Sequence, residues 1–168
     1  MITNVDYCCS TLAGVSGSLL QRLQSVLNAA ARLVFSARWS EHIMPLLREQ
    51  HWLKVLERIH FRLCVLTHRC LRGTAPPYLA DTLQSTADVQ ERCRLKSAST
   101  STLVVPPTRR ATVGDRVFPA DASCAWNSHS NFGQEIQSQP AFRQKLKTTL
   151  FDISFPADWP SYSCIRCP

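Results

Sequence analysis

The strongest structural signal in this sequence is a regular spacing of apolar residues across residues 18–37, SLLQRLQSVLNAAARLVFSA. Apolar side chains recur at intervals of three and four residues, which is the period of one face of an α-helix. The residues of this face are Leu19, Leu23, Val26, Ala30 and Leu33. The pattern predicts an amphipathic helix, and such a helix needs an apolar partner to cover its face.

A second stretch with the same period, LKVLERIHFRLCVLTHRCLRG, supplies a suitable partner. Its apolar face consists of Val55, Ile59, Leu63, Leu66 and Cys70, and Gly73 is placed to end the helix. Shorter helices are predicted over residues 40–50 and 76–83, each with a proline near its start. We therefore expect a mainly α fold, with a helical region at 1–84 that holds a small helical bundle over residues 16–84.

The second half of the chain is less regular. Residues 85–102 are rich in serine and threonine and are predicted to be a linker. Residues 103–151 form a mixed segment, in which LVV at 103–105 and RVF at 116–118 are candidates for short strands. This segment ends in one amphipathic helix whose face carries Phe142, Leu146 and Leu150, and residues 152–168 are predicted to be an irregular tail.

Three potential metal ligands lie on one face of the second long helix. His60, Cys64 and His68 are spaced by four residues, so their side chains project in roughly the same direction. A structural zinc site requires a fourth ligand, and Cys70 lies off this line. Cys164 and Cys167 form a single C-x-x-C pair without the second pair of a zinc ribbon. We therefore predict no metal site and no cofactor, with the histidine–cysteine face as a weak candidate.

No motif for catalysis is found in the sequence. The nucleophile elbow G-x-S-x-G, the phosphate-binding Walker loop, the dinucleotide fingerprint and the zinc motif H-E-x-x-H are all lacking. Two-metal phosphoryl transfer requires clustered carboxylates, and the chain has no adjacent aspartate pair. We predict a protein that is not an enzyme and that has no small-molecule substrate.

The charge of the chain favours an acidic partner. Its formal net charge is +7, and basic residues lie within and after the predicted linker. They could track a phosphate backbone, so we predict weak, salt-dependent binding of RNA or DNA. The candidate contacts are Arg92, Arg94, Lys96, Arg109, Arg110 and Arg116.

The expected location is intracellular. The first seven residues are polar and contain no apolar core of a secretory signal, and no apolar stretch is long enough to span a membrane. The eight cysteines are then expected to remain reduced. We predict a cytoplasmic or nuclear protein that is neither secreted nor membrane-bound.

Several phrases in order resemble one family. DYCCSTLAGVSGSLLQRLQSVLNAAARLV is similar to a segment of LINE-type, non-LTR retrotransposon polyproteins of the jockey-like kind. The likeness continues through HIMPLLREQHWLKVLERIHFRLCVLTHRCLRGTAPPYLADTL and returns at LVVPPTRRATVGDRVF, at WNS and at FRQKLKTTLF, so it covers about residues 5–151. The resemblance implies a region behind the reverse-transcriptase polymerase, near the carboxyl end of the polyprotein.

This resemblance implies an auxiliary role in holding template RNA or DNA. The paired aspartates of the polymerase are not in the chain, so no catalytic residue is carried over. Cys9 stands where the pattern has asparagine, Lys54 where it has proline, and His129 where leucine follows WNS. These departures fit a fragment from a decayed genomic copy that was re-started at an internal methionine.

An alternative from another class is a small helical protein-interaction module. In this interpretation the apolar faces of residues 19–34 and 55–70 are partly exposed and dock a partner helix or a second copy of the chain.

Overall fold

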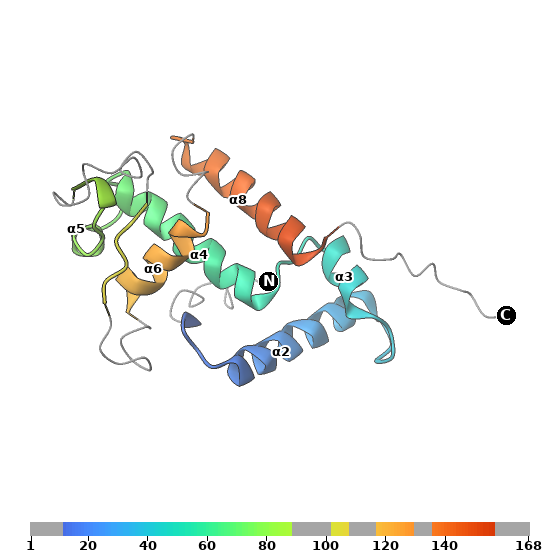
Figure 1. Ribbon diagram of the computed structural model, residues 1–168. Coiled ribbons are helices and arrows are strands. Elements are labelled where there is room, and N and C mark those ends of the chain that lie inside the picture. Colours follow the sequence, from blue (N-terminus) through green and yellow to red (C-terminus); the bar gives the residue numbers. More distant parts are fainter. Residues whose placement is uncertain (1–11, 89–101, 108–116, 130–135, 157–168) are drawn as a thin grey trace.

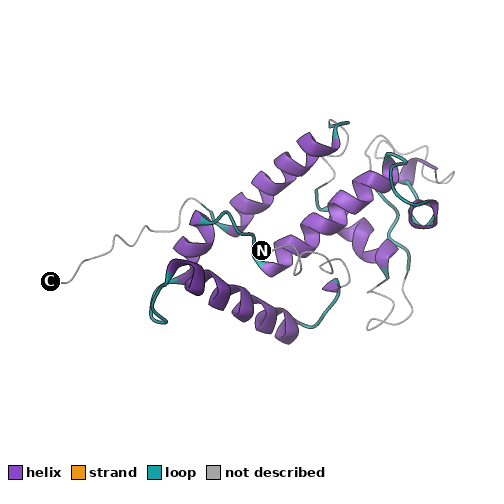
Figure 2. Cartoon of the chain, turned by 180° about the vertical axis from the view of Figure 1, so that it is seen from behind, coloured by secondary structure: helices purple, strands orange, loops and turns teal. Residues whose placement is uncertain are grey.

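The computed structural model describes residues 12–88, 102–107, 117–129 and 136–156. These parts are mainly α, as predicted, and no strand occurs in them (Figures 1 and 2). The helices are α2 (Gly17–Phe35), α3 (Ile43–Glu49), α4 (Val55–Leu71), α5 (Pro77–Ala80), α6 (Phe118–Asn127) and α8 (Gln139–Ser154), with a 3-10 turn, η2, at Thr86–Asp88. None of them combines the length and the apolarity needed to cross a bilayer.

Helix α4 is the centre of the fold. It packs against α2, α5, α6 and α8, and in Figure 1 it runs between α2 and α8. Its predicted apolar face is confirmed for Val55, Ile59, Leu63 and Cys70, which are buried, while Leu66 is half-buried. Cys64 and Thr67, on other sides of the helix, are fully buried as well. The helix is therefore covered on most of its circumference, as expected for the core of a helical bundle.

The ends of α4 are fixed by two different devices. Gly73 has a positive φ of 66°, and the next residue, Thr74, donates its backbone N–H to Arg69 O at 2.9 Å. This is a Schellman ending, which confirms the predicted role of Gly73. At the start, the backbone N–H of Val55 donates to the side-chain oxygen of Gln24 on α2 at 2.9 Å. A side chain 31 residues away in sequence thus caps the helix.

The buried face of α2 differs from the predicted one. Leu27 and Ala31 are buried, whereas Leu19, Val26 and Leu33 of the predicted face are exposed. The prediction was wrong because α2 is apolar on two adjacent faces, and the periodicity alone does not say which face meets the core. The burial of Leu27 and Ala31 in the common core decides the orientation.

The expected strands are not formed in the described residues. Leu103 makes only an isolated bridge with Ser85, and Phe118 begins α6 instead of ending a strand. Pro119 lies in the first turn of α6, where proline is tolerated, and the alanines that follow favour a helix. The sequence prediction missed α6, whose Ala122 and Trp126 are buried against α4.

The extended segment at 102–107 is held by α6 and by the start of η2. Asn127 acts on it in two ways: its side-chain oxygen accepts the N–H of Leu103, and its amide donates to Leu103 O, both at 2.9 Å. Thr86 also donates its backbone N–H to Thr102 O at 3.0 Å. These contacts attach both ends of the predicted linker to the helical core, while residues 89–101 lie outside the described parts.

The face predicted for the last helix is confirmed. Phe142, Leu146 and Leu150 are buried in the contact between α8 and α4. The helix continues to Ser154, which is buried too, so residues 152–154 belong to the helix rather than to an irregular tail. Residues 157–168 lie outside the described parts.

Candidate nucleic-acid interface

The basic residues proposed from the sequence as nucleic-acid contacts all lie outside the described parts of the chain. They are Arg92, Arg94, Lys96, Arg109, Arg110 and Arg116. The structure therefore neither brings them together nor separates them, and they remain a prediction.

A different group of basic side chains meets around a cavity of about 360 Å³ between α4, α8 and the loop before α4. Helix α4 contributes Arg58 and Arg62, and α8 contributes Arg143 and Lys147. Each pair is spaced by four residues, so its two members lie on one helix face. No acidic side chain is among the described residues that line this space, which we call the basic cavity.

The four cations of the basic cavity differ in exposure. Arg58 is only 7% exposed, and its Nε donates to Leu53 O at 2.9 Å. Arg62 is half-buried, whereas Arg143 and Lys147 are exposed. Arg58 is thus a fixed part of the wall, whereas Arg143 and Lys147 are exposed to solvent.

Aromatic rings complete the wall of the basic cavity. The ring of Trp52 lies 5.8 Å from the guanidinium carbon of Arg58, and Phe61 lines the cavity from α4. Both rings are half-buried. Aromatic faces next to cations are the usual elements of sites for single-stranded nucleic acid, in which a base stacks while phosphates contact the cations.

The position of Trp52 follows from the end of α3. His51 has a positive φ of 50°, which is uncommon for a residue other than glycine. The turn is closed by two backbone hydrogen bonds, from His51 N–H to Arg48 O at 3.0 Å and from Trp52 N–H to Leu47 O at 2.9 Å. This left-handed turn redirects the chain and places His51 and Trp52 in the cavity wall.

The weak metal candidate consists of residues with other contacts. Cys64 is fully buried, its thiol donates to Ala125 O at 3.4 Å, and burial raises its pKa to about 12. His68 is buried and stacks on Phe142 with ring centroids 4.3 Å apart. No group of three potential metal ligands is found within the described ranges. Cys64 and His68 serve as core side chains here.

The protonation of His68 follows from its surroundings. Its Nε2 lies 3.1 Å from Ile136 O and donates to this carbonyl, while its Nδ1 is buried without a hydrogen-bond partner. Burial lowers the pKa of His68; the bond to Ile136 opposes this shift and nearby Arg72 adds to it. The neutral ring is therefore the form that suits this site.

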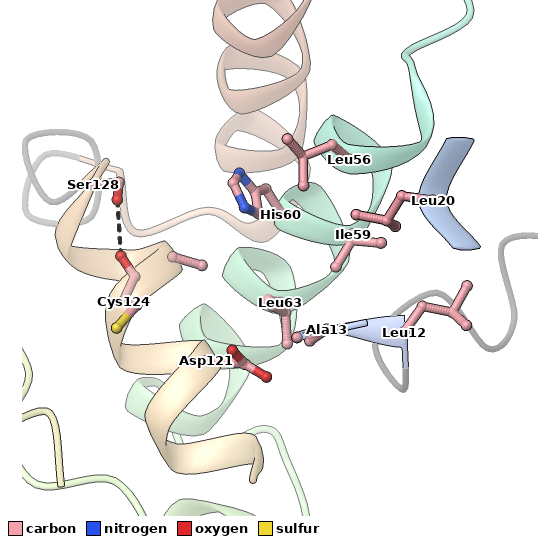
Figure 3. Close-up of a pocket in the computed structure, with 12 residues that line it drawn as sticks. Leu12, Ala13, Leu20, Leu56, Ile59, His60, Leu63, Asp121, Cys124 and Ser128 are labelled. Carbon is pink, nitrogen blue, oxygen red and sulfur yellow. Dashed lines mark hydrogen bonds between the residues drawn. The ribbon is translucent and has the colours of Figure 1, made fainter. Parts of the chain in front are cut away.

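His60 faces a second, smaller cavity of about 150 Å³ between α4, α6 and the segment before α2 (Figure 3). Burial lowers the pKa of His60, His129 lowers it further, and Glu57 opposes both. The lining is mostly apolar and includes Leu20, Leu56 and Ile59, which Figure 3 shows to one side of His60. This cavity lacks the cations of the basic cavity, so phosphate binding is not favoured there.

Comparisons of the chain with models of protein families, with curated proteins and with solved structures give no match. The interpretation of the basic cavity therefore rests on its own residues and distances. Sequence reasoning missed it, although the two cation pairs at four-residue spacing were a usable signal.

Proposed function

We propose that this protein is a non-catalytic fragment of a LINE-type retrotransposon reverse-transcriptase polyprotein, and that it serves as an auxiliary nucleic-acid-binding region. The observation that carries the binding proposal is the basic cavity, where the exposed Arg143 and Lys147 line the same space as the half-buried rings of Trp52 and Phe61. The origin in a retrotransposon rests on the sequence resemblance.

Single-stranded RNA or DNA is the ligand that fits this arrangement best. The exposed cations Arg143 and Lys147 on α8 offer contacts to consecutive phosphates. Trp52 offers a ring face to one unpaired base, which a duplex keeps stacked inside. Contacts of this kind read the backbone rather than the base sequence, so binding is expected to be weakly sequence-dependent.

The first prediction concerns Arg143→Ala combined with Lys147→Ala. We expect this pair to weaken binding of a labelled single-stranded RNA of about 16 nucleotides, measured by fluorescence polarisation. If both side chains contact phosphates, the slope of log affinity against log salt falls by about 1.4 in magnitude, because two fewer counterions are released.

A matched pair controls for the loss of net charge. Arg22→Ala with Arg38→Ala removes the same charge from exposed positions on and after α2, away from the basic cavity. We expect this control to retain the salt slope of the unchanged protein. Equal weakening by both pairs would contradict a localised site. If binding is lost only when Arg92, Arg94, Arg109 and Arg110 are replaced by alanine, the contact lies in the predicted linker and the segment after it.

A second candidate function is helix-mediated protein interaction, and one observation favours it. Val26 is 66% exposed and Leu33 81% exposed on α2, although both belong to a regular apolar face. The corresponding face of α4 is buried, so it is not available to a partner in this fold. Of the two predicted docking faces, only the one on α2 is therefore offered to a partner helix.

A further inference from the structure

Helix α2 carries an uncovered line of apolar side chains. Leu19, Val26 and Leu33 are 45%, 66% and 81% exposed. They are spaced by seven residues, which is two turns of a helix, so they follow one another along the same side. Figures 1 and 2 show α2 at the edge of the molecule, with α3 and α4 on one side of it only.

Two half-buried residues complete the pattern of this line. Leu23 and Ala30 alternate with the exposed residues at intervals of four and three. The five together have the heptad spacing of a helix–helix seam, in which apolar side chains interlock with those of a partner helix. We call Leu19, Leu23, Val26, Ala30 and Leu33 the outer seam of α2.

The outer seam is held in a fixed position. Leu27 and Ala31, on the adjacent inner face, are buried in the core. The side chain of Gln24 on the same helix binds both Asn28 and the start of α4. A partner would therefore meet a helix that is already formed, which reduces the entropy cost of docking.

The charges on α2 indicate the chemistry of the partner. Its charged residues are Arg22 and Arg32, and its sequence contains no acidic residue. Arg22 is exposed, and it lies three residues after Leu19 and four before Val26, next to the seam. Coiled-coil partners choose each other through opposite charges at such flanking positions.

Two other occupants fit less well. A second copy of the chain would add two more arginines to the interface and no carboxylate from α2. Binding to an anionic membrane surface does not require heptad spacing, whereas the outer seam has the spacing typical of helix pairs.

We propose that the outer seam of α2 docks an acidic amphipathic helix of a partner protein, with leucine-like residues in the seam and a carboxylate opposite Arg22. The inference rests on the second candidate function and is independent of nucleic-acid binding in the basic cavity.

The probe is a synthetic peptide of about three heptads with leucine at a and d and glutamate at e and g. Binding to the full chain is measured by fluorescence polarisation, beside a peptide with lysine in place of glutamate. We expect the glutamate peptide to bind at least about tenfold more tightly. Arg22→Glu is expected to reverse this preference, and this charge exchange leaves the seam itself unchanged.

Val26→Asp with Leu33→Asp is expected to abolish peptide binding. Ile153→Asp is the matched control, because Ile153 is an apolar residue on α8 that is 59% exposed. RNA binding should be retained in both of these variants and in Arg22→Glu. Failure of this inference is therefore distinct from failure of the nucleic-acid proposal. Thermal unfolding of each variant verifies that it is folded.

Three outcomes would overturn the proposal. Equal affinity for the two peptides, or no binding of either, would remove the acidic helix as the partner. A dimer in light scattering that Val26→Asp and Leu33→Asp dissociate would assign the seam to a second copy. Binding to phosphatidylserine vesicles without peptide binding would assign it to a membrane surface.

Discussion

At the scale of single residues, the side chains that most suggest chemistry in the sequence have packing roles in the structure. Cys64 of α4 is buried and its thiol donates to Ala125 O of α6, and His68 is stacked on Phe142. A thiol whose pKa is raised to about 12 by burial is protonated at neutral pH and is a poor ligand or nucleophile. Sequence spacing placed these side chains on one face, but only the packing of α6 and α8 shows that this face is interior.

The buried His68 leads to a pH-dependence of stability. Its pKa is lowered in the folded protein, so below the ordinary value of 6.5 the unfolded chain binds a proton that the folded chain excludes. The free energy of unfolding is therefore expected to fall on acidification below pH 6.5, by at most about 1.4 kcal/mol per pH unit for this one group. Urea unfolding measured at several pH values tests this.

The variant that isolates this effect is His68→Gln. In this variant the free energy of unfolding should change less steeply with pH. His42→Gln, which replaces an exposed histidine before α3, is the control substitution. A residual slope in His68→Gln is expected, because burial also lowers the pKa of His60. Identical slopes in His68→Gln and the unchanged protein would show that His68 is not the titrating group.

At the scale of helices, the sequence predicts where a helix forms better than it predicts which face of that helix is buried. The face of α8 was predicted correctly because its apolar residues are flanked by charged and polar ones, which leaves one choice. Helix α2 has two adjacent apolar faces, so its sequence fits two rotations about the helix axis. The contacts of Leu27 and Ala31 select one of them, and these contacts are tertiary.

Helix α6 was missed for a related reason. Its sequence FPADASCAWN buries small residues such as Ala122 and Ser123, so the large apolar side chains that reveal a helical period are few. Close approach to α4 needs these small side chains. A helix of this kind is recognised by its proline at the start and its alanines rather than by leucine spacing.

Gln24 joins two helices, and its removal is predicted to affect the start of α4. In Gln24→Ala the backbone N–H of Val55 loses its acceptor, so we expect a loss of about 1 kcal/mol in the free energy of unfolding. Urea denaturation followed by circular dichroism measures this. Gln21→Ala, at an exposed glutamine one turn earlier on α2, is the control and should be nearly neutral.

At the scale of the whole molecule, the two halves of the chain share one core. Leu27 from α2, Leu63 from α4 and Leu146 from α8 belong to the same cluster of buried side chains. The basic cavity has the same origin, since its cations come from α4 and α8. Neither the cavity nor the shared core could be read from the sequence, because local periodicity contains no information on which distant helices meet.

A shared core predicts cooperative unfolding. Leu146 is fully buried, so Leu146→Ala is expected to lower the free energy of unfolding by about 2–5 kcal/mol through the cavity that it leaves. Circular dichroism, which reports all helices, and tryptophan fluorescence should shift together in urea. Thr148→Ala on the exposed side of α8 is the control. Two separate transitions would contradict a single core.

The central position of α4 also determines when the protein can fold during synthesis. Much of its circumference is covered by α6 and α8, which leave the ribosome only after α4 has been made. Until then the apolar surface of α4 around Cys64 is exposed to water or bound by a chaperone. Helix α8 therefore completes the described core, and a nascent chain stopped before it would be a target for quality control.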